Sequence, residues 1–75
     1  MNKRLQVNLE YIDVTLKNMN TNSKEITDHL VNVTDNNSYD DNYEELAYIE
    51  SRIDKLLEDV NNLKNTITRA YDNLD

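Results

Sequence analysis

The chain of 75 residues is one domain or part of one, and it contains no Gly, Pro, Cys, Phe or Trp. Without Cys there is no disulfide, thiolate nucleophile or thiolate metal site, and without Gly there is no phosphate-cradling loop. The formal net charge is −7 at pH 7, and nearly all of it comes from residues 38–75. We therefore expect no binding to nucleic acid, which requires a basic surface. We also expect no insertion into membranes, because no apolar run approaches the length of about 20 residues that a membrane span needs.

The spacing of apolar residues predicts a long helix over residues 3–34. Apolar side chains recur at alternating steps of four and three residues, which is the a/d pattern of a coiled coil rather than the alternation of a strand. The predicted seam consists of Leu5, Leu9, Ile12, Leu16, Met19, Ser23, Ile26, Leu30 and Val33. Most residues at 18–23 are poor helix formers, so the helix can bend or fray there.

A second helix is predicted over residues 40–74, after a turn at 35–39. Its seam consists of Leu46, Ile49, Ile53, Leu56, Val60, Leu63, Ile67, Ala70 and Leu74. Ser38 with Asp41, or Asp41 with Glu44, has the spacing of a capping box at the start of this helix. Matched helix lengths and a short connector predict an all-α fold, an antiparallel two-helix hairpin that is coiled-coil-like.

Such a hairpin is predicted to need a partner. Ordering each residue costs on the order of 1.5 kcal/mol, which one seam rarely offsets. We therefore expect the hairpin to complete a helical bundle, with another helical protein or by dimerisation. Two patches are candidates for partner binding: Val7, Tyr11 and Val14 on a face away from the first seam, and Leu57 and Tyr71 beside the second.

No pattern in the sequence predicts an enzyme, and we expect no catalytic residue, metal site or cofactor. His29 is the single His and has no companion at ligand or base spacing. The polar run at 35–41 has part of the spacing of a calcium loop, but the central Gly is missing and the twelfth position is Leu46. Two long helices also form no concave pocket that would shift the pKa values of the many carboxylates.

The chain ends with Tyr71-Asp72-Asn73-Leu74-Asp75, a Tyr-x-x-x-Asp motif where the second helix is predicted to end. With this motif, its small size, its acidity and its hairpin pattern, the chain resembles the small helical-hairpin proteins of type VII (ESX-like) secretion. The resemblance implies that the hairpin pairs with another helical hairpin. It also implies that Tyr71 and Asp75 form part of an export signal, and on a helix the two side chains would share one face.

The connecting turn lacks the Trp-x-Gly of that family's best-known members and carries Tyr39 and Tyr43 nearby instead. The chain is therefore more similar to the divergent small partners of LXG-type toxins. That resemblance implies a targeting partner that packs on the toxin's helical N-terminal region. It implies a cytoplasmic protein, or one secreted without a cleaved signal peptide, since no signal-peptide pattern is present.

Other interpretations of the same sequence stay open. Tyr71 can simply be a packing residue on the flank of the seam. The whole chain can be a self-associating structural or regulatory module that forms a homodimeric four-helix bundle. A third interpretation is an inhibitory or immunity-type protein that uses its acidic second helix against a basic partner.

Overall fold

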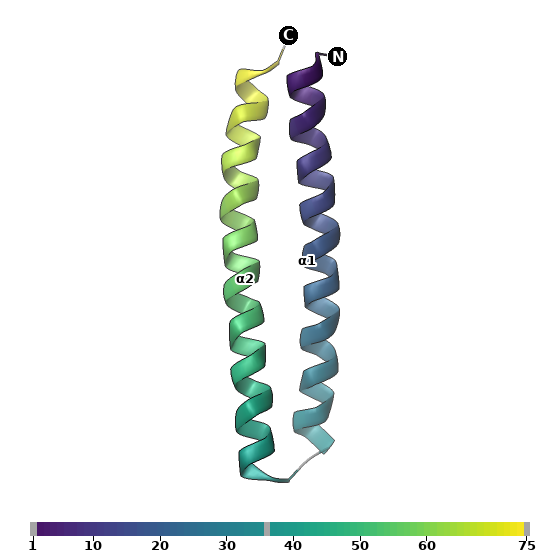
Figure 1. Ribbon diagram of the computed structural model, residues 1–75, viewed down its shortest axis with the longest axis vertical. Helices are drawn as coiled ribbons and strands as arrows, with labels where there is room; N and C mark the ends of the chain where they lie inside the picture. The colour runs from purple at the N-terminus through teal and green to yellow at the C-terminus, as the bar shows by residue number, and fades with distance from the viewer. Residues whose placement is uncertain (1, 36, 75) are drawn as a thin grey trace.

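Two long helices make up the fold in the computed structural model, which describes residues 2–35 and 37–74. Helix α1 spans Lys3–Asp35 and helix α2 spans Tyr39–Asp72. They run antiparallel side by side, with both chain ends at the same end of a rod that measures 57 × 15 × 11 Å (Figure 1). The predicted all-α helical hairpin is confirmed, although α2 ends two residues before the predicted residue 74.

Helix α1 continues without a break through residues 18–23, where the sequence favours helix least. Asn22 is buried, and its side-chain oxygen accepts a hydrogen bond from Arg52 of α2 at 3.1 Å. The hydroxyl of Thr21 donates to the backbone oxygen of Lys17 one turn earlier. Packing and hydrogen bonding therefore outweigh the weak helix propensity of this stretch.

Helix α2 begins at a side-chain cap. Ser38 has an extended backbone (φ −75°, ψ 125°), and its hydroxyl oxygen accepts a hydrogen bond from the backbone N–H of Asp41 at 3.4 Å. Asp40 and Asp41 lie in the first turn, where their negative charge interacts favourably with the positive end of the helix dipole. Of the two capping positions that the sequence offered, Ser38 is the one used.

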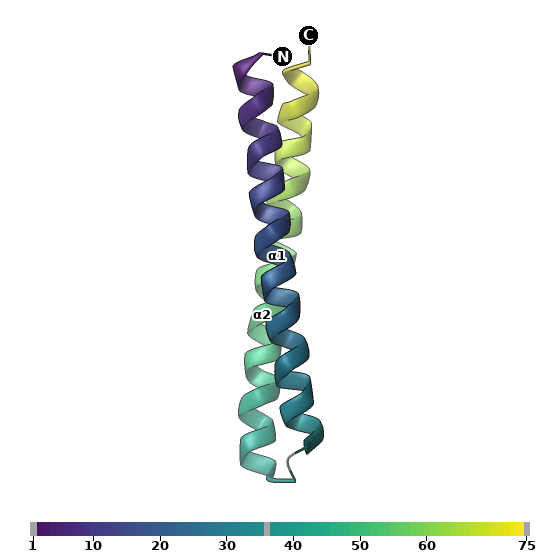
Figure 2. The same ribbon diagram turned by 90° about the vertical axis from the view of Figure 1, so that its right-hand side faces the viewer.

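The two helices wind about each other, so that their ribbons cross when the rod is turned by 90° about its long axis (Figure 2). Apolar layers alternate with polar layers along their contact, as the less exposed side chains show. The apolar layers contain Leu5, Ile12, Met19, Ile26 and Val33 of α1 with Ile49, Leu56, Leu63 and Ala70 of α2. The polar layers contain Asn8, Thr15, Asn22 and His29 of α1 with Glu45, Arg52, Asp59 and Thr66 of α2.

The prediction for every second seam position was therefore wrong by one residue. Asn8 and Thr15 face α2, whereas Leu9 and Leu16, which were predicted to do so, are exposed. In α2, Ile49 retains 7% of its exposure, but Ile53 retains 45%. Adjacent helical residues point about 100° apart, so the seam is rotated away from the centre of each apolar stripe.

Replacing the capping hydroxyl in Ser38→Ala is expected to lower the free energy of unfolding by about 1 kcal/mol, because one backbone donor of the first turn loses its partner. Urea denaturation followed by circular dichroism, at fixed protein concentration, measures this change. Ser51→Ala is the control, since the Ser51 hydroxyl only donates to the backbone oxygen of Tyr48 within the helix. Equal stability of the two variants would contradict a capping role for Ser38.

Candidate interaction surface

The most connected polar layer of the seam surrounds Arg52. Its Nη1 donates to the Asn22 side-chain oxygen at 3.1 Å, and its Nε donates to the Tyr48 hydroxyl at 2.8 Å. Its Nε also lies 3.3 Å from the Glu25 carboxylate, which accepts a further bond from the Tyr48 hydroxyl at 3.1 Å. The guanidinium stands 4.9 Å above the centre of the Tyr48 ring, a cation–π contact. These bonds join the helices while satisfying groups that packing partly removes from water.

A second polar layer lies near the turn. The Nδ1 atom of His29 contacts the carboxylate of Glu45, whose other oxygen accepts a bond from the Asn32 amide at 3.4 Å. The His29 ring also stacks at a tilt on Tyr48, with ring centres 4.1 Å apart. His29 therefore links the helices through a carboxylate and an aromatic ring of α2.

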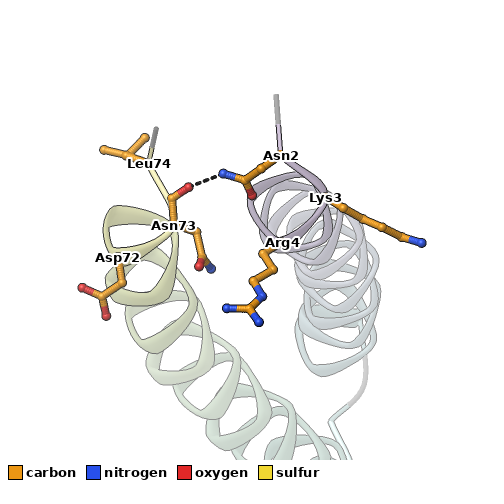
Figure 3. A pocket seen from close by; sticks show the side chains of 6 residues that line it. All are labelled: Asn2, Lys3, Arg4, Asp72, Asn73 and Leu74. Atoms are coloured by element: carbon orange, nitrogen blue, oxygen red, sulfur yellow. Dashed lines mark hydrogen bonds between the residues drawn. The ribbon is translucent and has the colours of Figure 1, made fainter.

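The open end of the hairpin is closed by asparagines. The side-chain amide of Asn2 donates to the backbone oxygen of Asn73 at 2.6 Å (Figure 3). The side-chain amide of Asn73 in turn donates to the Asn8 side-chain oxygen at 2.8 Å. Arg4 extends toward the gap between the helix ends and Lys3 points away from it (Figure 3). These bonds hold the two ends of the described chain together across the rod.

Asp59 is the most buried carboxylate of the seam, with 5% of its surface exposed. One of its oxygens accepts a bond from the Lys55 ammonium at 3.0 Å, and the other has no partner. Hydrogen bonding to Asp59, together with its negative charge, raises the pKa of Lys55 above the ordinary 10.5. Because the folded pKa of Lys55 is raised, the contribution of its ammonium to stability is present at neutral pH and is lost as pH rises through that raised pKa.

The exposed apolar residues directly beside the seam form a stripe along both helices, interrupted in α1 by Ser23, which we call the apolar face. It contains Leu9, Leu16 and Leu30 of α1, Leu46, Ile53, Val60 and Ile67 of α2, and Leu74 just after α2. In both helices these residues follow a polar seam residue by one position. In an antiparallel pair this common offset turns both stripes toward the same side of the hairpin.

A wholly apolar groove marks the end of this face near the termini. It has a volume of about 290 Å³ and is bordered by Leu5, Leu9 and Ile12 of α1, by Ile67, Ala70 and Tyr71 of α2, and by Leu74 just after α2. Side chains from both helices therefore meet on the apolar face.

The exposed surface of the hairpin is large for its mass. The chain exposes 5793 Å², whereas a compact monomer of its mass exposes roughly 4,800 Å². The difference of about 1,000 Å² is the size of a modest protein–protein interface. An apolar stripe that runs along both helices is typical of a surface that another protein covers.

The five predicted partner-binding residues do not form one surface. All are exposed, but Val7 lies two positions after seam residue Leu5 and therefore about 200° around α1. Val14 has the same offset from the next seam turn, so both point away from the apolar face, and Tyr11 lies on that far flank. Leu57 and Tyr71 instead border the apolar face. The leucines and isoleucines at the centre of the apolar face are exposed, although the sequence had assigned them to the contact between the helices.

Tyr71 of the predicted export motif is exposed near the end of α2 and borders the apolar groove. Asp75 lies outside the described residues. Helix α2 ends at Asp72, one residue after Tyr71, so Tyr71 lies in the last turn of the helix.

Among the described residues, no three His, Cys, Asp or Glu side chains gather as a metal ion would require. In the same part of the chain, neither helix has an apolar stretch long enough to cross a membrane. No family model, curated protein or solved structure matches this chain.

Arg52→Ala is expected to lower the free energy of unfolding by about 1–3 kcal/mol, because the buried Asn22 oxygen loses its donor and Glu25 loses its counter-charge. Thermal and urea unfolding measure the loss. Arg69→Ala is the matched control, since Arg69 is an exposed residue of the same helix. A loss no larger than that of the control would mean that the Arg52 layer does not hold the hairpin together.

Proposed function

We propose that this protein acts by binding: it lays its apolar face on another helical protein and completes a helical bundle. The observation that carries this proposal is the position of the apolar face, which runs along both helices and stays exposed while polar residues occupy alternate layers of the seam. Apolar packing along two helices is the interaction by which four-helix bundles assemble. The proposed partner is therefore α-helical and presents an apolar stripe of comparable length.

We propose further that this partner is the helical N-terminal region of an LXG-type toxin, and that the protein helps to direct the toxin into type VII secretion. The support is the resemblance described from the sequence, together with the hairpin fold and the exposed Tyr71. Tyr71 and Asp75 would then contribute to the export signal. The protein would act in the cytoplasm or leave the cell with its partner, without a cleaved signal peptide.

Charged substitutions on the apolar face test the binding surface. The double variant Leu16→Asp and Ile53→Asp is expected to abolish co-purification with the toxin's N-terminal region after co-expression, because it places unpaired charges in an apolar contact. Val14→Asp is the control: Val14 is 55% exposed and Leu16 is 50% exposed, but Val14 lies on the opposite side of α1. Binding that survives the double variant and fails with Val14→Asp would reverse the assignment of the surface.

The export motif is tested separately from binding. Tyr71→Ala and Asp75→Ala are each expected to reduce toxin export several-fold, because the motif is read by the export machinery. Asp75→Ala separates export from binding: unlike Tyr71, which borders the apolar groove, Asp75 carries no apolar side chain, so its variant is expected to leave co-purification intact. Tyr43→Ala is the control, since Tyr43 is an exposed tyrosine at the equivalent heptad position near the turn. Unchanged export with both tail variants, measured by immunoblotting of culture medium, would exclude a role for this motif.

A further inference from the structure

We propose that in the isolated protein the apolar face is covered by a second copy of the chain, packed antiparallel about a twofold axis at Leu57. This inference rests on the proposed role of the apolar face as a binding surface and names what occupies it before any other partner does. The turns of the two copies would lie at opposite ends of a four-helix bundle, with α2 of one copy beside α2 of the other.

The edge of α2 beside the apolar face has a symmetric sequence. One residue per heptad lies along this edge, and all are exposed; in order they are Tyr43, Glu50, Leu57, Lys64 and Tyr71. A twofold axis at Leu57 brings Leu57 against itself, and Tyr43 against Tyr71 of the second copy. An isologous interface requires such a pattern, because each residue must meet its own counterpart or its mirror position.

The charges on this edge are also complementary between two antiparallel copies. Under the same axis Glu50 faces Lys64 of the second copy, and Lys64 faces Glu50, which makes two ion pairs in each dimer. Across residues 2–35 and 37–74, neither Glu50 nor Lys64 has an ion-pair partner within its own chain. The two residues are fourteen positions apart, about 21 Å along the helix, too far to pair with each other.

The apolar residues next to this edge fall into matching layers. Ile53 lies four residues before Leu57 and Val60 lies three after it, so Ile53 of one copy meets Val60 of the other within about 1.5 Å of height. Leu46 and Ile67 are related in the same way. The axis that pairs the charges therefore also pairs the large apolar side chains of α2.

The distribution of charge along the rod favours the antiparallel arrangement. The turn end carries exposed Asp35, Asp40, Asp41 and Glu44, whereas the terminal end carries three cations, Lys3, Arg4 and Arg69, against one described carboxylate, Asp72. A second copy packed in the same direction would set the two acidic ends side by side. Antiparallel packing separates them by nearly the 57 Å length of the rod, several times the Debye length of about 8 Å. It also sets each acidic end beside a basic one.

The area available is sufficient for a stable dimer. Two separate hairpins each expose 5793 Å², and a compact protein of twice the mass exposes roughly 8,000 Å². Association would thus bury roughly 3,600 Å² in total, which lies in the range of obligate homodimers.

Sedimentation equilibrium and a single-cysteine cross-link test the arrangement. The full chain is expected to sediment at twice its mass, and Leu57→Cys is expected to give a covalent dimer with a short bis-maleimide. The chain contains no other Cys, and Ser51→Cys, on the far side of α2, is expected to give none. A monomer at high concentration would overturn the proposal. A dimer that cross-links no better in the Leu57→Cys variant than in the Ser51→Cys variant would also overturn it.

Charge reversal provides a second test. Glu50→Lys or Lys64→Glu alone is expected to weaken dimerisation about tenfold at low salt, because each places like charges opposite one another twice. The double variant E50K with K64E is expected to restore it, since the reversed charges pair again only in the antiparallel register. No rescue in the double variant would overturn the register. Co-purification of the unaltered protein with a toxin is measured separately from its self-association, so failure of the dimer is distinguishable from failure of the proposed function.

Discussion

The contact between α1 and α2 contains a polar layer in nearly every heptad, and the behaviour of the molecule depends on this arrangement. Removing polar groups from water is unfavourable unless they find hydrogen-bond partners. Arg52 meets that requirement by binding Asn22 of α1 together with Tyr48 of its own helix, and His29 does so by contacting Glu45. These pairs fix which residues of α1 and α2 lie opposite one another, much as a polar core residue fixes register in a coiled coil.

The same arrangement leaves the hairpin incomplete. Every apolar layer of the seam is only partly covered, because a pair of helices encloses residues from one side alone. Ile49 is the single apolar side chain of the described residues that becomes buried. Most of the leucine and isoleucine surface lies on one side of the rod, where only a further helix can remove it from water. The polar seam therefore aligns the hairpin, while most of its large apolar side chains stay available for packing with another chain.

The helices, the turn and the Ser38 cap were predictable because each depends on local spacing: a 3.5-residue apolar repeat, matched lengths and a capping serine before a helix. The side of each helix that packs against the other helix was not predictable in this way. Thr15 and Leu16 are neighbours in sequence, and a seam predicted from apolar residues alone always places Leu16 rather than Thr15 between the helices. That assignment assumes that the hairpin contact is the principal one. If a helix packs against its own hairpin partner on one side and against another chain on the next side, its apolar residues are shared between the two contacts. The apolar repeat does not indicate which residues belong to which contact.

A surface that matches itself can still serve a different partner. The residues along the edge of α2 alternate between apolar or aromatic groups and single charges, as Leu57 between Glu50 and Lys64 illustrates. Any helix with opposite charges at the same two-heptad spacing would fit this edge as well as a second copy does. A partner with a longer or better-filled apolar stripe would then displace the second copy by mass action, since both need the same face. Self-association would in this way keep the apolar face covered until that partner is present.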